Sequence, residues 1–328
     1  MAAVEAVAAP PPDPGELLEA VEALLLGGPP ELTRAQVAER AGVELATATS
    51  LWHLLGFPES ADDEPVFTEA DVTALRQAAQ LIDAGILDEQ SQNALVRTWG
   101  RSFARLAEWQ VRLLAGIAVD AEDPGRRLEE LALDVVPVVE ELQAYIWRRH
   151  QLAATTRLLM RPAADAERLA VGFVDIVGYT SRSKTMEDGE LVDLVEHFED
   201  VATSATTDHG GRIVKTIGDE VLFVADDPAA AAELALDLVG RSEADEAFPQ
   251  VRAGVAYGAV VERLGDVFGP TVNIASRLTS VARPGSVLVD QGMHEVLEGE
   301  AYQLHRTRRV SVKGYRHLEP WRLRARDR

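Results

Sequence analysis

The sequence predicts two domains: an all-α domain over residues 16–160 and an α+β domain of ferredoxin-like βαββαβ order over residues 161–328. Three observations support this fold class. Apolar residues recur at helical spacing from about Gly15 to Met160. Beyond a proline-containing boundary at residues 161–164, short apolar runs typical of buried strands alternate with amphipathic segments. A length of 328 residues is sufficient for two hydrophobic cores.

The first domain follows an Ala/Pro-rich segment, residues 1–15, which we expect to be disordered. Two short helices separated by a turn at Gly42 give residues 32–55 a helix-turn-helix pattern. Thr68 is typical of a helix N-cap, so another helix should begin there. Further helices are predicted over residues 89–119, 124–136 and 138–160, and the last is a linker helix that enters the second domain. Four of the five tryptophans lie in this half and are expected in its core: Trp52, Trp99, Trp109 and Trp147.

The second domain is expected to begin with a buried strand over residues 168–175, followed by an amphipathic helix over residues 190–206. Two strands around Ile217, Gly218 and Asp219 indicate a tight hairpin. The predicted elements that follow are a helix over 228–241, a strand over 251–261, a helix over 271–281, a strand over 286–290, and tail strands over 309–313 and 321–324. This order predicts an α+β sandwich with helices on one face of the sheet.

Composition excludes several classes of protein. The absence of cysteine excludes disulfides, thiolate zinc sites and cysteine nucleophiles. No apolar run is long enough for a membrane span, and the N-terminus lacks a signal-peptide pattern, so we expect a cytoplasmic protein. The net charge of −22 disfavours nucleic acid, and also a polyphosphate substrate unless metal ions or placed cations intervene. Of the 32 basic residues only Lys184, Lys215 and Lys313 are lysines. They mark sites that need a compact charge, or they reflect codon bias.

Two acidic residues suggest a metal site. Asp175 ends a buried strand before a Gly turn, and Asp219 lies at the tip of the hairpin. If the hairpin pairs beside the first strand, the two carboxylates converge and can hold two divalent cations. The backbone N–H groups of the turn around Gly178 and Thr180 can cradle phosphates. Taken singly, each residue is better explained by ordinary structure, Asp175 as a helix N-cap and Asp219 as a turn residue.

From about Arg168 to Trp321 the sequence resembles the class III nucleotidyl cyclase catalytic domain. Four blocks carry the resemblance, in family order: the strand motif around Asp175, residues 215–219 (KTIGD), residues 266–277 (DVFGPTVNIASR) and residues 312–314 (VKG). Several blocks at family spacing are far more specific than one motif.

The resemblance implies roles for individual residues. Asp175, Asp219 and the Ile176 carbonyl would bind two divalent cations, Mg²⁺ or Mn²⁺. Lys215 and Asp266 would read the base, and this pair implies ATP as the substrate, because adenine offers an acceptor at N1 and a donor at N6.

Further roles concern the rest of the nucleotide. Asn273 would position the ribose, Arg277 would meet charge on the α-phosphate, and Lys313 would hold the terminal phosphates. Arg263 is a candidate phosphate ligand or else an ordinary surface arginine. Phe173, Gly178 and Thr180 complete the implied substrate-binding set. Because one chain carries both half-sites, the resemblance implies a symmetric homodimer.

Residues 16–160 also resemble the helical regulatory domain that precedes some actinobacterial class III cyclases. Regulation would then pass through the linker helix 138–160. An effector would be a small lipid-like molecule between the helices, or a proton acting at His150. Ordinary core packing and a solvated surface histidine are the simpler explanations of these features.

Other functions are open at this point. The helix-turn-helix at residues 32–55 would suit a DNA-binding regulator, but its second helix has no Lys or Arg. A catalytically inactive cyclase-like sensor is the other alternative, and the complete residue set argues against it. A diguanylate cyclase is disfavoured because residues 217–221 (IGDEV) replace its hairpin motif.

Overall fold

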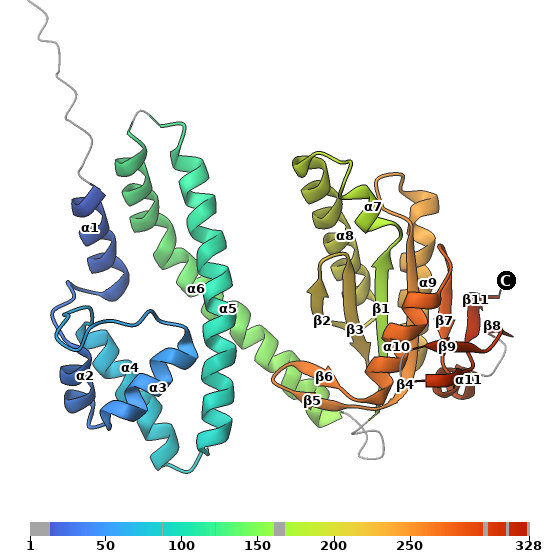
Figure 1. Ribbon diagram of the computed structural model, residues 1–328, viewed down its shortest axis with the longest axis horizontal. Coiled ribbons are helices and arrows are strands. Elements are labelled where there is room, and N and C mark those ends of the chain that lie inside the picture. Colours follow the sequence, from blue (N-terminus) through green and yellow to red (C-terminus); the bar gives the residue numbers. More distant parts are fainter. Residues whose placement is uncertain are drawn as a thin grey trace, which may run out of the picture. The chain divides into compact units, whose positions relative to one another are not determined.

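The computed structural model describes residues 14–86, 88–121, 123–160, 168–297, 301–312 and 315–326. The chain divides into two compact units, residues 1–155 and residues 156–328 (Figure 1). Residues 1–13 of the segment expected to be disordered lie outside the described part of the chain, and the first helix begins at Pro14.

The N-terminal unit is built from helices, as predicted. They are α1 (Pro14–Leu26), α2 (Arg34–Ala41), α3 (Leu45–Leu55), α4 (Glu69–Asp83), α5 (Glu89–Ala118) and α6 (Pro124–Met160). Helix α2 is capped by Thr33 and ends at Gly42, whose φ of 72° suits glycine, so the helix-turn-helix is confirmed. Thr68 caps α4 and forms a capping box with Asp71, also as predicted.

Helix α6 differs from the prediction. It runs from Pro124 to Met160 as one helix with Pro137 in its interior, so the predicted break between residues 136 and 138 is wrong. A proline removes one backbone N–H and crowds one preceding carbonyl. The hydrogen bonds of the turns on either side are retained, and they are sufficient to carry the helix through.

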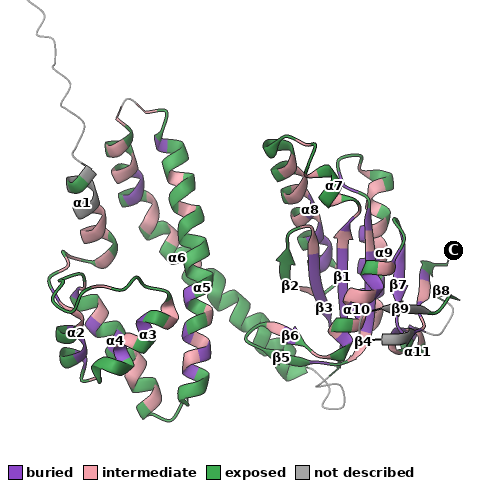
Figure 2. Cartoon of the chain, in the orientation of Figure 1, coloured by how far each residue is buried: buried purple, intermediate pink, exposed green. Residues whose placement is uncertain are grey.

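The tryptophan prediction holds only for Trp52, which is 9% exposed and packs among α2, α3 and α4. Trp99, Trp109 and Trp147 are 42%, 61% and 57% exposed, so the prediction that they belong to the core is wrong. They lie on α5 and α6, which carry long exposed stretches (Figure 2). The physical reason is that these helices extend past the small core that α2, α3 and α4 can cover.

The second unit has the predicted βαββαβ order. Its elements are β1 (Arg168–Ile176), α7 (Tyr179–Arg182), α8 (Asp188–Asp208), β2 (Arg212–Ile217), β3 (Glu220–Ala225), α9 (Pro228–Ala244), β4 (Val251–Ala259), β5 (Val261–Arg263), β6 (Asp266–Phe268), α10 (Pro270–Val281), β7 (Val287–Val289), α11 (Gln291–Leu297), β8 (Tyr302–Arg306), β9 (Val310–Val312), β10 (Tyr315–Leu318) and β11 (Trp321–Ala325). The main sheet has the order β2-β3-β1-β4-β7-β11-β8, and β1 runs antiparallel to both β3 and β4.

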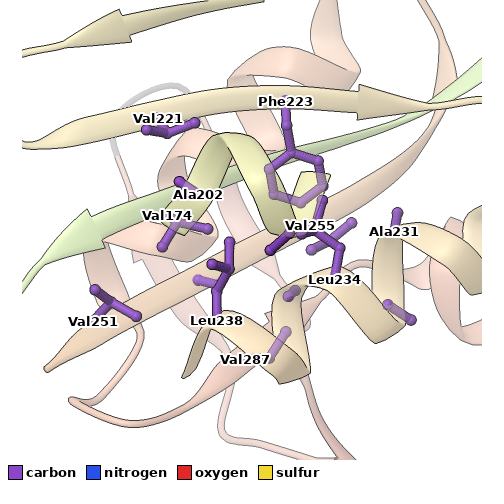
Figure 3. Packing of buried hydrophobic residues seen from close by; sticks show 14 of the residues in the cluster. Val174, Ala202, Val221, Phe223, Ala231, Leu234, Leu238, Val251, Val255 and Val287 are labelled. Atoms are coloured by element: carbon purple, nitrogen blue, oxygen red, sulfur yellow. The ribbon is translucent and has the colours of Figure 1, made fainter. Parts of the chain in front are cut away.

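Helices cover both faces of this sheet, which corrects the expectation of one. Alternate residues of β1 point to opposite sides. Val174 faces a core that includes Ala202 of α8 and Leu234 of α9 (Figure 3), whereas Phe173 lies in a second cluster with Ala275 of α10. The expected one-sided arrangement holds for α8 and α9, and α10 occupies the other face.

Glycine at position 254 permits the close approach of α10. A Cβ atom there would lie 2.3 Å from the backbone nitrogen of Thr279 and 2.6 Å from the carbonyl oxygen of Ala275. The Thr279 hydroxyl also donates to the carbonyl of Phe173 on β1, at 3.3 Å. Backbone contact of this kind fixes the position of α10 against β1 and β4.

Strand β4 stops at Ala259, two residues before its predicted end. The chain then forms a small antiparallel hairpin of β5 and β6 with Leu264 and Gly265 at positive φ in its turn. This hairpin places Asp266. Among the described residues, no helix combines the length and the hydropathy needed to cross a membrane.

Candidate active site

The two predicted metal carboxylates lie side by side. Strand β1 pairs with β3 so that Asp175 stands opposite Glu220, and the Ile176 N–H donates to the carbonyl of Asp219 at 3.1 Å. Gly218, with φ of 64°, makes the tight β2–β3 turn that brings Asp219 to this position. Burial raises the pKa of the Asp219 carboxyl, and the nearby charge of Asp175 raises it further.

Glu220 adds a third acid to this end of the sheet. Burial, followed by the charges of Asp175 and Asp219, raises the pKa of Glu220 to about 7. Carboxylates crowded in this way repel each other, and a bound cation relieves the repulsion.

Arg252 is a functional candidate that the sequence reasoning missed. It stands opposite Asp175 on the neighbouring strand β4, and its Nε lies 2.7 Å from Asp175 Oδ2. Its Nη1 also donates to the carbonyl of Ser280 at the end of α10, at 3.3 Å. One signal could have revealed it: a charged residue between Val251 and Ala253 in an otherwise apolar strand needs a partner.

These residues fit divalent metal ions of the magnesium type. Among the described residues, no group of three or more His, Asp or Glu side chains could hold a metal ion by itself. Mg²⁺ in nucleotide enzymes is commonly held by one or two carboxylates together with substrate phosphates and water. Asp175 and Asp219 provide that number of carboxylates at one point, with the Ile176 backbone beside them.

The predicted base-reading residues also meet. Lys215 Nζ on β2 lies 2.6 Å from Asp266 Oδ2 on β6, and both side chains are partly exposed. The Val267 N–H donates to the other carboxylate oxygen, Oδ1, at 2.8 Å, which orients the Asp266 carboxylate. The pair therefore presents an ammonium donor and a carboxylate acceptor next to each other at the surface.

Asn273 and Arg277 lie one turn apart on α10, as their spacing predicted. Asn273 is exposed and Arg277 is half-buried. Arg263 is exposed on β5 and stands in register with Asp266 across the small hairpin. Lys313 lies outside the described residues.

The remaining predicted residues surround the end of β1. Gly178 takes a φ of 75° and precedes the short helix α7, in which Thr180 is exposed. Ile176 is buried. Phe173 is also buried, with its side chain in the sheet core rather than at the surface.

The second unit is the catalytic unit of a nucleotidyl cyclase. Residues 162–325 match the family described as "Adenylate and Guanylate cyclase catalytic domain". The chain therefore belongs to the adenylate and guanylate cyclase family and is an enzyme.

Curated relatives extend the similarity beyond the catalytic unit. An adenylate cyclase of Streptomyces coelicolor is 43% identical over 87% of this chain and 77% of its own length. An adenylate cyclase of Glutamicibacter nicotianae is 38% identical over 94% of this chain and 83% of its own. A pH-sensitive adenylate cyclase of Mycobacterium tuberculosis is 31% identical over 80% and 69%.

Solved cyclase domains match about half of the chain. The catalytic core of a rhodopsin-guanylyl cyclase with converted specificity, in complex with ATPαS, is 23% identical with a TM-score of 0.46, covering 49% of this chain and 97% of that one. The adenylyl cyclase CyaB of P. aeruginosa is 22% identical with a TM-score of 0.44, covering 49% and 96%.

Proposed function

We propose that this enzyme converts ATP to 3′,5′-cyclic AMP and pyrophosphate, with two divalent cations at each site of a homodimer, and that it acts in the cytoplasm. The observation that carries the proposal is the contact between Lys215 and Asp266. An ammonium group can donate to adenine N1 and a carboxylate can accept from the N6 amino group. Guanine would present the opposite pattern to this pair. The names of the actinobacterial relatives support the same choice of base.

The metal site would be formed by Asp175, Asp219 and the carbonyl of Ile176. When bound, Mg²⁺ or Mn²⁺ would lower the pKa of the ribose 3′-hydroxyl and offset the charge of the triphosphate. Arg252 holds the Asp175 carboxylate in place through its Nε contact. The N–H groups of the turn at Gly178 and Thr180 would bind phosphate oxygens.

The other residues would orient the nucleotide for an intramolecular reaction. Asn273 would position the ribose so that its 3′-oxygen faces the α-phosphorus, and Arg277 would offset charge that develops on the α-phosphate. Lys313 and Arg263 would contact the remaining phosphates. The 3′-oxygen forms the new P–O bond as the bond to pyrophosphate breaks, so no covalent enzyme intermediate is needed.

A homodimer is supported by the exposed apolar residues of α5 and α6. In the N-terminal unit these side chains follow spacings of three and four residues, which is the pattern of helices that pack against other helices. On α5 they include Trp99, Phe103, Leu106, Trp109, Leu113 and Ile117, each between 37% and 61% exposed. On α6 they include Val138, Leu142 and Tyr145, each more than half exposed. A second copy of the chain would cover these faces.

The helical unit would regulate the catalytic unit through α6, with a small molecule or a proton as the effector. The pH-sensitive relative supports this, since its similarity covers 80% of the chain. His150 is exposed on α6 and is the histidine that we would test first. DNA binding is disfavoured because α3, the second helix of the helix-turn-helix, contains no Lys or Arg.

The direct test is an assay of the full-length enzyme with ATP and with GTP, each with Mg²⁺ and with Mn²⁺. Cyclic AMP should form from ATP with either metal, and chelation of the metal should abolish it. An Asp175→Asn variant, which keeps the size of the side chain, is the matched inactive control. Preferential turnover of GTP would contradict the base assignment, and full activity with a chelator would contradict the metal site.

A further inference from the structure

Strand β2 contains a β-bulge at the point where it presents Lys215. Ile213 stands opposite Phe223 of β3, and Lys215 stands opposite Leu222, so Val214 is an extra residue between the two pairs. Side chains of paired residues lie on the same face of a sheet, and Leu222 packs in the cluster on the α10 face. The bulge therefore turns Lys215 to the α10 face, whereas strict alternation would send it to the opposite one.

Arg212 lies on the same face of β2. It stands opposite Val224, which belongs to the same cluster as Leu222. Arg212 Nη2 is 2.5 Å from Glu262 Oε2 on β5, and Lys215 Nζ is 2.6 Å from Asp266 Oδ2 on β6. Two ion pairs therefore connect one strand of the main sheet to the two strands of the small hairpin.

The β5–β6 hairpin has few other contacts to hold it. It forms a separate two-stranded sheet, and within the described residues 261–268 only Val267 is buried. A hairpin of two short strands is marginally stable by itself. Glu262 stands opposite Val267, so both side chains lie on the face that meets the main sheet. The position of the hairpin therefore depends on Val267 and on the ion pairs to β2.

The two ion pairs differ in what happens to them when a base binds. In the function proposed above, adenine takes the donor of Lys215 and the acceptor of Asp266. Their direct contact is then exchanged for contacts to the base and no longer holds the hairpin. The pair of Arg212 and Glu262 remains, because neither residue has a role in reading the base.

We propose that Arg212 and Glu262 are positioning residues for base recognition, and that their ion pair holds the β5–β6 hairpin where Lys215 and Asp266 can both reach adenine. This role rests on the base-reading function proposed above for Lys215 and Asp266. The side chains of Arg212 and Glu262 are 27% and 42% exposed. A partly exposed pair of this kind adds little to the stability of the whole chain, so its effect should be confined to the hairpin.

The first measurement needs no substrate. Hydrogen–deuterium exchange of the full-length enzyme without nucleotide would follow the amide groups of residues 261–268. Arg212→Gln and Glu262→Gln should each raise the exchange rate of these amides about fivefold, because local opening of the hairpin becomes easier. Exchange in β1 should not change. The melting temperature should fall by no more than about 3 °C, which would confirm that both variants fold.

The second measurement is steady-state kinetics with ATP and with GTP. In each single variant the KM for ATP should rise about fivefold, and the preference for ATP in kcat/KM should fall by a similar factor. The value of kcat should change by less than about twofold, since the residues proposed to act on the reacting atoms are unchanged. The double variant should lose about as much as either single one, because the two residues act as one pair; independent residues would give a loss of about 25-fold.

Arg241→Gln is the matched control. It breaks the ion pair between Arg241 and Asp237, whose Nη2 and Oδ2 atoms are 2.9 Å apart on α9 of the same unit. This variant should resemble the wild type in hairpin exchange and in both kinetic measurements.

Three results would overturn the proposal. The first is unchanged exchange of residues 261–268 in folded Arg212→Gln and Glu262→Gln. The second is faster exchange with unchanged KM and base preference, and the third is an additive loss in the double variant. A wild-type enzyme that does not prefer ATP would instead contradict the proposed function, and the exchange rates would still decide whether this pair holds the hairpin.

Discussion

Arg252 contributes both to the candidate active site and to the packing around the sheet. It pairs with Asp175 on the adjacent strand and with the last turn of α10, so it connects the proposed metal carboxylate to the helix that carries Asn273 and Arg277. Asp175 is only 15% exposed, which makes a fixed cation beside it more valuable than a surface partner would be.

Replacing Arg252 by Ala should therefore lower cyclic AMP formation about 10²-fold, the size of effect seen when one positioned donor is removed from an active site. Arg252→Lys should recover part of the activity because it restores the charge without the forked geometry. Steady-state kinetics on both variants would check this. Arg324→Ala, an exposed arginine on β11, is the control. Wild-type kinetics in folded Arg252→Ala would remove this residue from the site.

The base-reading pair yields a second prediction. In a double variant, Lys215→Glu with Asp266→Cys, the donor and acceptor for adenine are both lost. Turnover of ATP should fall by several orders of magnitude, up to about 10⁴, because a site built to hydrogen-bond a base edge leaves buried polar groups unmatched. GTP turnover need not appear, since pocket shape also contributes. Unchanged ATP kinetics in the double variant would contradict the assignment of both residues.

The raised pKa of Glu220 predicts that the stability of the folded chain depends on pH when divalent cations are absent. Its pKa is raised from 4.5 to about 7 in the folded chain, mainly by burial. Between these values the folded state binds the proton more readily than the unfolded state, so stability declines as pH rises through this window. Thermal melts with chelator should show a smaller decline in Glu220→Gln. The exposed Glu295→Gln is the control, and equal slopes in wild type and Glu220→Gln would contradict the prediction.

At the scale of elements, the contact between α10 and β4 decides where Asn273 and Arg277 lie. Gly254→Ala would place a methyl group against the backbone of Thr279 and Ala275, and backbone cannot rotate away as a side chain can. We expect a loss of about 1–3 kcal/mol in the free energy of unfolding, measured in urea.

Gly240→Ala is the matched control for this substitution. Gly240 lies within α9, is exposed, and has nothing within 4 Å of the position of an added Cβ. It should gain about 0.5–1 kcal/mol from improved helix propensity. Equal changes in the free energy of unfolding in the two variants would show that the close approach of α10 to β4 does not limit the size of the residue at position 254.

At the scale of the whole molecule, the proposal that two chains share each active site is tested by combining two inactive variants. If Asp175 and Asp219 serve one half of each site and Asn273 and Arg277 of the partner serve the other, Asp175→Ala and Arg277→Ala should each be nearly inactive. In a mixed dimer one site carries both defects and the other is intact. Random pairing at equal amounts makes half the dimers mixed, so recovered activity should be about a quarter of wild type. Coexpression with two different tags allows the mixed dimers to be purified and assayed, and mixed dimers as inactive as the parents would exclude shared sites.

The amino-acid pattern alone determined most of the elements, and the resemblance to the cyclase family identified the two side-chain pairs. Helical and strand periods are local, so the helix-turn-helix, the β2–β3 hairpin and the βαββαβ order follow from spacing and from caps such as Thr68 and Gly42. The family blocks around Asp175, Lys215 and Asp266 contain both side-chain pairs, and the fold places the two members of each pair next to each other.

Tertiary structure decided the rest, because long-range packing has no local signature. The register of β4 against β1 placed Arg252 beside Asp175, and the close approach at Gly254 put α10 on the face opposite α8 and α9. A core too small to cover α5 left Trp99 exposed, although tryptophan usually favours burial. Each outcome depends on contacts between residues that are distant in the sequence, so a local sequence pattern cannot predict it.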